Sequence, residues 1–366
     1  GYDSFGLPAE QYAVQTGNNP NGFTQTNIKT FTKQLQELGF DYDWSKMIAT
    51  SDPEFYHWTQ WIFKQLYKDG YAKYVDMPVN WCEELGTVLS NDEVIDGKSE
   101  RGGYPVIRKN MKQLCIDQAA FAERLLEGLN EIDWPESTKE MQRNWIGRST
   151  GVEVQFEIVG GGKFSIFTTC IETIYGITFM VLAPDGDLVQ ELMPRIKNQD
   201  EVKAYIQETV SKSEMDRTEL NKGKTGCRLE GIKAINPVNG REVEVFIGDF
   251  VLANYGTGAV MAVPSHDQRD FEYAIAHNID RIQVIEGQDV SEHAFEKQDY
   301  LGKGCKLINS EEFTGLTVEE AKVAITKKLV DMGIAKETVN YRFREWIFAR
   351  QRYWGEPVPI VHLEDG

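Results

Sequence analysis

A cluster of three threonine hydroxyls is the first feature of the sequence that could do chemistry. Thr168, Thr169 and Thr173 stand within six positions in Phe167-Thr-Thr-Cys-Ile-Glu-Thr-Ile-Tyr-Gly176. Hydroxyl groups can hold a water molecule or a ribose by hydrogen bonds without bringing charge. Threonine also favours strands because it is β-branched, so ordinary strand packing is the alternative interpretation.

A glycine-rich strand followed by charged residues is a second candidate site, in Tyr255-Gly-Thr-Gly-Ala-Val-Met-Ala-Val-Pro-Ser-His-Asp-Gln-Arg-Asp270. Its glycines let the backbone approach a ligand closely, and Met261 and Val263 share one face of the predicted strand. Asp267 and Asp270 stand at a predicted helix start, where an acid favours a substrate ammonium group. The alternative for Asp267 is the N-cap of that helix. A third glycine is missing, so this is no dinucleotide fingerprint.

Two more candidate motifs lie at the two ends of the sequence. In Gly1-Tyr-Asp-Ser-Phe-Gly-Leu-Pro-Ala-Glu10, Asp3 precedes a turn and a helix entry. Its carboxylate could face an amino group or simply cap the helix. In Arg350-Gln-Arg-Tyr-Trp-Gly-Glu-Pro-Val-Pro359, Arg350 and Arg352 alternate in a stiff segment, where they could meet phosphates or form a surface turn.

Helical patterns with short strands are expected before residue 150. Apolar residues at three-to-four spacing predict helices over 23–39, 53–69 and 117–129. Trp58 and Trp61 are expected in the core. Residues 74–110 look like short strands and turns, with turn signals at 96–97 and 102–103.

The pattern changes at about residue 151, where Val152, Val154, Phe156 and Ile158 alternate as in a strand. The expected strands that follow are 164–169, 177–183, 241–247 and 258–263, and the expected helices are 187–193, 199–210, 270–277 and 317–332. Strands mixed with helices predict an α+β or α/β domain, inserted between boundaries near 151 and 340.

Composition indicates an ordinary intracellular protein of more than one unit. The 366 residues, 41% of them hydrophobic, allow two or three packed units. The net charge of −18 argues against a non-specific nucleic-acid binder, whose footprint is basic. Five scattered cysteines without a CxxC pair indicate a reducing cytoplasm. No apolar run approaches the roughly 20 residues that span a bilayer, and no signal peptide is visible.

Together the four motifs resemble leucyl-tRNA synthetases. Phe5 favours leucyl over isoleucyl and valyl enzymes, which usually have His there. The segments Val79-Asn-Trp-Cys82, Thr87-Val-Leu-Ser-Asn91 and Met141-Gln-Arg-Asn-Trp-Ile-Gly-Arg-Ser149 match leucyl patterns as well. Each motif alone is weak, but the match covers nearly the whole chain. Because Met is missing and both ends fall inside motifs, we expect an internal piece of a longer protein.

The resemblance implies an α/β class I synthetase whose Rossmann-type catalytic domain is split by an inserted α/β editing domain. Residues 1–150 would be catalytic-domain sequence with a degenerate zinc-type insertion, 151–340 the editing domain (connective peptide 1), and 341–366 the return to the catalytic domain. The full-length enzyme would be a monomer that ligates leucine to its tRNA with ATP and Mg²⁺. The His-x-Gly-His and Lys-Met-Ser-Lys-Ser signatures that bind ATP are absent, so this chain should not activate leucine.

The resemblance also implies roles for single residues. Asp3 would hold the amino group of leucine and Phe5 would line that synthetic pocket. In the editing pocket, Asp270 would anchor the amino group of the mischarged amino acid, and Thr173 would block leucine sterically. The other implied editing residues are Thr168, Thr169, Tyr255, Met261, Val263 and Asp267, and the predicted tRNA contacts are Arg350 and Arg352.

The chain departs from the family in two places. The family's Thr-Thr-Arg-Pro-Asp-Thr reads Thr-Thr-Cys-Ile-Glu-Thr here, so Cys170 replaces an Arg that would contact tRNA and Glu172 replaces an Asp. In the zinc-type insertion only Cys82 remains, with Ser99 and Gly102 where partners would stand. One thiolate cannot make a tetrahedral site, so we predict no zinc; stoichiometric zinc in a metal analysis would contradict this.

The main hypothesis is hydrolysis of leucine-accepting tRNA charged with a near-cognate such as norvaline or isoleucine. One methylene in an apolar pocket discriminates by only roughly 1–3 kcal/mol, which is why sister synthetases use a second, hydrolytic sieve. No Ser/His/Asp triad or metal cluster appears near the threonines, which fits a positioning mechanism. The alternative, indicated by Cys170 and Glu172, is a tRNA-docking module with a decayed editing site.

Overall fold

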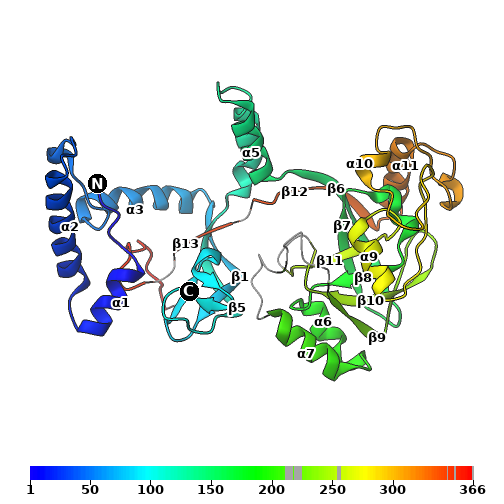
Figure 1. The fold of residues 1–366 in the computed structure, drawn as a ribbon, viewed down its shortest axis with the longest axis horizontal. Coiled ribbons are helices and arrows are strands. Elements are labelled where there is room, and N and C mark those ends of the chain that lie inside the picture. Colours follow the sequence, from blue (N-terminus) through cyan, green and yellow to red (C-terminus); the bar gives the residue numbers. More distant parts are fainter. Residues whose placement is uncertain (211–216, 218–224, 254–256, 344, 350–351, 365–366) are drawn as a thin grey trace.

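The molecule is elongated, with its helical and sheet-bearing parts arranged in a row (Figure 1). The computed structural model describes residues 1–210, 217, 225–253, 257–343, 345–349 and 352–364. Helices α1–α3 occupy one end, a four-stranded sheet lies in the middle, and a seven-stranded sheet with its helices forms the other end. Within these ranges, no helix is long and apolar enough to cross a membrane.

In the N-terminal segment, two α-helices connect the two residues of an isolated parallel β-bridge. Tyr2 and Ala49 pair in parallel, and helices α1 (Leu7–Thr16) and α2 (Pro20–Glu37) connect them. Both helices begin near a proline, whose fixed φ suits the first turn. Gly17 ends α1 at a φ of 68°, a left-handed conformation that glycine adopts without a Cβ clash. Helix α2 confirms the helix predicted over 23–39.

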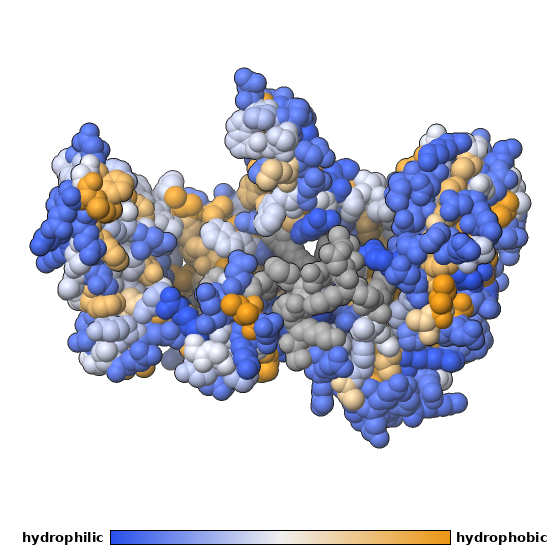
Figure 2. All heavy atoms as spheres, viewed as in Figure 1, coloured by the Kyte–Doolittle hydropathy of each residue, from blue (hydrophilic) through white to orange (hydrophobic). Residues whose placement is uncertain are grey.

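Helix α3 (Pro53–Lys68) confirms the second predicted helix, but the prediction that its tryptophans are core residues is wrong. Trp58 is 62% exposed and Trp61 55% exposed, whereas Phe63 is 2% exposed. Only the Phe63 side of the helix meets the sheet, where its ring stacks on Phe348 with 5.0 Å between centroids. Figure 2 accordingly shows apolar side chains at the surface over α2 and α3.

The central sheet is built on one long antiparallel ribbon. Its strands, in spatial order β13, β5, β1 and β2, are Trp346–Ala349, Ile107–Ile116, Ala72–Cys82 and Thr87–Leu89. The short strands predicted over 74–110 are therefore wrong for β1 and β5, which pair from Ala72 with Ile116 to Trp81 with Ile107. The predicted turns lie in the excursion between them, with β3 (Val94–Ile95), β4 (Lys98–Ser99) and η2 (Asn91–Glu93).

Helical segments lead from the ribbon to the large sheet. The helix predicted over 117–129 is present as η3 (Ala119–Phe121) and α4 (Ala122–Gly128), whereas α5 (Glu136–Ile146) was not predicted. Glu136 forms ion pairs with Lys139 and Arg143 along α5. Such polar spacing stabilises a helix locally but leaves little apolar periodicity to detect.

The seven-stranded sheet has the order β11-β8-β10-β9-β6-β12, with β7 paired to β6. In chain order β6 to β12 are Ser149–Ile158, Lys163–Thr168, Phe179–Leu182, Gly226–Ile235, Glu242–Gly248, Ala259–Ala262 and Ala335–Asn340. The sheet is curled, since β7, which pairs with β6, also contacts β11 at the other end of the strand order. The chain enters through β6 and leaves through β12, which pair antiparallel from Ser149 with Asn340 to Val154 with Ala335. The boundaries predicted near 151 and 340 fall in this strand pair.

Most of the core lies inside this curled sheet. Val154, Phe156 and Ile166 have no exposed surface, and they pack with residues of β9, η4 (Ile171–Gly176) and α11 (Val318–Asp331). The other helices that the described residues form around the sheet are α6 (Asp187–Leu192), η5 (Met193–Arg195), α7 (Gln199–Val210), α9 (Gln268–Ala276), α10 (Lys297–Tyr300) and η6 (Glu311–Phe313). These elements confirm the strands and helices predicted after residue 151, to within a few residues.

Candidate active site

The predicted threonines form a tight turn, residues 168–173, that links β7 to η4. Thr168 Oγ1 accepts the N–H of Cys170 at 3.0 Å, and Thr173 Oγ1 donates to the carbonyl of Cys170 at 2.8 Å. Thr168 and Thr173 are buried, whereas Thr169 is half-buried. Two of the three hydroxyls therefore brace the turn. Each hydroxyl has one donor and two acceptor sites, so Thr168 can hold its turn and still donate to a ligand.

The second predicted segment links β11 to α9 through a carboxylate. Asp270 Oδ2 accepts the N–H of Val263 at 3.0 Å, and Asp270 is only 7% exposed. Asp267 is the N-cap of α9 and accepts the N–H groups of Arg269 and Asp270, both at 3.0 Å. The capping interpretation of Asp267 is therefore confirmed. Met261 is half-buried and packs against the main core.

Strand direction brings these two segments to one edge of the sheet. β6 is antiparallel to both β7 and β9, so β7 runs in the same direction as β9. Strand β10 is antiparallel to β9, and β8 is parallel to β10, so both run opposite to β9. Strand β11 is antiparallel to β8 and therefore runs in the same direction as β9 and β7. Because β7 and β11 are neighbours, their carboxyl ends lie at the same edge (Figure 1). The threonine turn follows one end, and the segment leading to Asp270 follows the other.

Comparison with known proteins identifies the family of the chain. A family model described as "Leucyl-tRNA synthetase, editing domain" matches residues 143–330, and one described as "tRNA synthetases class I (I, L, M and V)" matches residues 12–225. A solved ternary complex of Agrobacterium radiobacter K84 agnB2 LeuRS with tRNA and LeuAMS is 32% identical, with a TM-score of 0.75 over 99% of this chain. The chain belongs to the leucyl-tRNA synthetase family.

This synthetase chain spans 42% of the length of that LeuRS chain. A methionyl-tRNA synthetase of Mycobacterium tuberculosis, solved with methionyl-adenylate, is more distant. It is 17% identical with a TM-score of 0.30, over 38% of this chain and 28% of that one, which is too little to carry an argument. The family and the α/β class predicted from the motifs are therefore confirmed, and the match with the editing-domain model includes the threonine turn and Asp270.

The motifs at the two ends of the synthetase sequence meet each other, away from the threonine turn. Arg352 forms an ion pair with Glu10 at 3.0 Å, and its side chain is 11% exposed. The ring of Phe5 lies edge-on to Trp354 at 5.2 Å, and Trp354 Nε1 donates to the carbonyl of Ser4 at 2.9 Å. The pairing gives Arg352 a role in joining the return segment to α1, and its contact with tRNA stays a prediction.

The other residues predicted at these motifs are placed as follows. Asp3 is exposed, and its Oδ1 accepts the hydroxyl of Thr50 at 3.2 Å. Its predicted role toward an amino group is untested. Tyr255 and Arg350 lie outside the described residues, so their predicted roles also stay predictions.

The segment predicted to be a degenerate zinc-type insertion contains a buried serine, Ser99, that forms two hydrogen bonds. Its hydroxyl donates to the carbonyl of Arg101 at 2.7 Å and accepts the N–H of Tyr104 at 3.0 Å, and Ser99 is 3% exposed. Cys82 is fully buried. Over the described ranges, no cluster of three or more His, Cys, Asp or Glu side chains suited to a metal occurs. The predicted absence of zinc stays a prediction.

Two residues beside the threonine turn, Tyr300 and Lys322, escaped sequence reasoning, and both contact the turn itself. Glu172 has no exposed surface, its Oε1 accepts the hydroxyl of Tyr300 at 3.1 Å, and burial raises the pKa of its carboxyl. Lys322 of α11 donates to the carbonyl of Thr169 at 2.9 Å. Partners 128 and 153 residues apart leave no local signal in a sequence.

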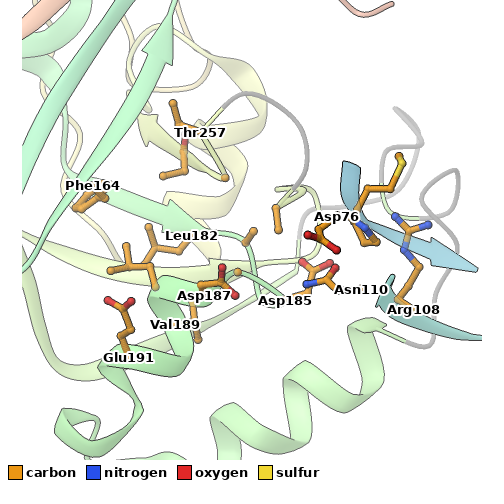
Figure 3. Close-up of a pocket in the computed structure, with 18 of the residues that line it drawn as sticks. Asp76, Arg108, Asn110, Phe164, Leu182, Asp185, Asp187, Val189, Glu191 and Thr257 are labelled. Atoms are coloured by element: carbon orange, nitrogen blue, oxygen red, sulfur yellow. Dashed lines mark hydrogen bonds between the residues drawn. The ribbon is translucent and has the colours of Figure 1, made fainter. Parts of the chain in front are cut away.

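A cavity of about 860 Å³ lies at the other end of β7 and β11, between them and the β1–β5 ribbon (Figure 3). Phe164 and Ala259, near the starts of the two strands, line it together with Asp76 and Arg108 of the ribbon. Neither the threonine turn nor Asp270 lines this cavity. Its charges are mixed, and Asp185 is already paired with the buried Arg217. The cavity is therefore separate from the predicted editing site.

His266 follows β11 and is buried between two loop segments. Its Nδ1 donates to the carbonyl of Phe295 at 3.0 Å, and its Nε2 accepts the N–H of Val284 at 3.0 Å. Only the neutral ring can make both bonds, because protonation would turn the acceptor into a donor. Burial accordingly lowers the pKa of His266 to about 4.

We expect this histidine to make the fold acid-sensitive. Since the pKa of His266 is about 4 when folded and near 6.5 when unfolded, the unfolded state binds more protons between these values. Stability present above pH 6.5 is therefore lost as the pH falls to 4, by up to about 1.4 kcal/mol per pH unit. Urea unfolding across this range should show less loss in His266→Gln than in wild type. The exposed His293→Gln should behave as wild type. Equal acid sensitivity in all three proteins would contradict the prediction.

Proposed function

We propose that this chain carries the editing centre of a leucyl-tRNA synthetase. It would hydrolyse the ester of leucine-accepting tRNA charged with a near-cognate amino acid such as norvaline or isoleucine. The observation that supports the proposal is the shared edge of β7 and β11, from which the threonine turn and the segment leading to Asp270 continue. Both segments also lie within the match to the editing-domain family.

The proposed chemistry needs binding and orientation more than a reactive side chain. The carboxylate of Asp270 would hold the ammonium group of the misplaced amino acid. The hydroxyls of Thr168 and Thr169 would hold the terminal ribose or the attacking water. Water adds to the ester carbonyl, the bond to the ribose oxygen breaks, and the free amino acid and uncharged tRNA leave. Holding the reactants in place can itself supply much of the acceleration.

The specificity of the site would come from Thr173 and the strand side chains. Thr173 is 1% exposed, and its hydroxyl is fixed to the carbonyl of Cys170, so its methyl group has a defined position. A rigid side chain of this kind can exclude leucine while smaller or differently branched residues fit. Tyr255, Met261, Val263 and Asp267 complete the proposed pocket.

The remaining assignments concern the longer enzyme. Residues 1–150 and 341–366 would belong to the catalytic domain, with 151–340 as the editing domain. In the full-length protein, which we expect to be a cytoplasmic monomer, Asp3 and Phe5 would bind leucine, and ATP and Mg²⁺ would serve its activation. Arg350 and Arg352 would contact tRNA. The motif resemblance and the match to the class I family support these proposals.

The test is deacylation of isoleucine-charged leucine-accepting tRNA by the chain. We expect release of isoleucine well above the spontaneous rate, and little release of leucine from the correctly charged tRNA. Tight tRNA binding without hydrolysis would instead select the docking module with a decayed site, which Cys170 and Glu172 favour. Faster hydrolysis on isoleucine- or valine-accepting tRNA would move the assignment to a sister enzyme.

A further inference from the structure

A lysine from a distant part of the chain brings a positive charge to the threonine turn, which has no basic residue of its own. The resemblance to leucyl-tRNA synthetases implies an arginine at the position of Cys170. A thiol cannot bind a phosphate as a guanidinium does. Lys322 instead reaches the turn from α11, and its Nζ donates to the carbonyl of Thr169 at 2.9 Å. The ammonium therefore lies one residue from the position of the missing arginine.

Lys322 is held there by a well-defined helix. Helix α11 begins with a capping box, in which the Thr317 hydroxyl accepts the N–H of Glu320 and the Glu320 carboxylate accepts the N–H of Thr317. Ala321 and Ile325 have no exposed surface, so this face of α11 packs on the core and against η4. Lys322 itself is half-buried at the rim of this packing. Its stem is thereby ordered before any ligand arrives.

The ammonium of Lys322 differs from its neighbours on the helix in having no acidic partner. Lys327 pairs with Asp331, and Lys328 pairs with Glu312. Among the described residues Lys322 forms no ion pair, and it acts on the buried Glu172 only through the field of its charge. One of its three N–H donors goes to Thr169, which leaves capacity for an anion.

In an editing reaction, the tRNA substrate would supply an anion for the Lys322 ammonium. The chain carries a net charge of −18, which repels a polyanion, so a local cation at the threonine turn matters for capture. The nearest anions of a bound aminoacyl-tRNA are the phosphates of its single-stranded 3′ end. We propose that Lys322 binds a 3′-terminal phosphate of the tRNA and replaces the arginine lost at Cys170. This inference rests on the proposed editing function and names a tRNA contact within it.

The experiment measures binding of uncharged leucine-accepting tRNA as a function of salt, so it does not depend on hydrolysis. Lys322→Met keeps the stem and removes the charge, and it should weaken binding about tenfold at low salt. The slope of log affinity against log salt should become less steep by about 0.7, the value for one single-strand phosphate contact. Lys322→Arg should bind like wild type. Lys327→Met, on the same helix but 76% exposed, is the matched control and should also bind like wild type.

A purely structural role for Lys322 predicts a different result. The double variant Cys170→Arg with Lys322→Met restores a charge at the turn without restoring the bond to Thr169, and we expect it to recover affinity and salt slope. Unchanged affinity and slope in Lys322→Met would overturn the proposal, as would loss in Lys322→Met that Cys170→Arg does not rescue. If wild type binds tRNA but releases no isoleucine, the proposed function fails while this binding test still decides the role of Lys322.

Discussion

Asp270→Asn should slow the hydrolysis of isoleucyl-tRNA by roughly tenfold to a hundredfold, the worth of a charge-assisted hydrogen bond. The substitution removes the charge but keeps the shape of the side chain. The amide oxygen of Asn can still accept the N–H of Val263, the bond that Asp270 Oδ2 makes at 3.0 Å. A loss of hydrolysis with an unchanged thermal unfolding midpoint would report the missing attraction for the substrate ammonium.

Asp187→Asn is the matched control for this experiment. Asp187 is an exposed acid in the first turn of α6, in the same curled sheet unit, so both variants lose one negative charge near a helix start. We expect wild-type deacylation from Asp187→Asn. An equal loss in both variants would attribute the effect to overall charge. No loss in Asp270→Asn would remove this residue from the proposed ammonium site.

Sequence patterns predicted the curled sheet unit well because its elements have one buried face. The alternation from Val152 to Ile158 appears as β6, whose inward residues are buried and whose outward residues are not. Helix α11 shows the corresponding helical periodicity, with Val318, Ala321 and Ile325 fully buried. When one side of an element is buried, apolar residues recur in the sequence at the spacing of a strand or a helix. Such elements can therefore be found from residue types alone.

The same reasoning failed where elements are exposed on both sides or pack only in part. The strands β1 and β5 carry polar residues on both faces, so their length was hidden although they pair continuously. The apolar face of α3 predicted a buried helix, yet Trp58 stays exposed because only Phe63 meets the sheet. A hydrophobic pattern shows that a face can be buried, and only tertiary structure decides what covers it.

The candidate site also has features that the sequence predicted and features that only the structure shows. Motif resemblance predicted Thr168, Thr173 and Asp270 as site residues, and the strand directions bring their segments to one edge. It could not show that the threonine hydroxyls brace their own turn, since that depends on backbone conformation. Lys322 was invisible for another reason, because its contact with Thr169 joins residues 153 positions apart and has no motif.

Phe156→Ala should destabilise the curled sheet by about 3–5 kcal/mol, which is the usual cost of removing a buried aromatic ring. Phe156 lies on β6 with no exposed surface, and its ring stacks on Phe164 of β7 with 5.7 Å between centroids. Its loss leaves a cavity between the two strands that carry the chain to the threonine turn. Hydrogen exchange of β6 and β7 amides measures the change, because it reports this unit separately from the helical end of the molecule.

Trp58→Ala provides the contrast, since it removes a larger ring from a position that is 62% exposed. We expect it to change stability by less than about 0.5 kcal/mol, as for most surface substitutions. A small effect of Phe156→Ala would mean that β7 is not held by this core, and the threonine turn would then lack a rigid support. Because positioning supplies much of the proposed acceleration, editing should decline in Phe156→Ala even at temperatures where the protein stays folded.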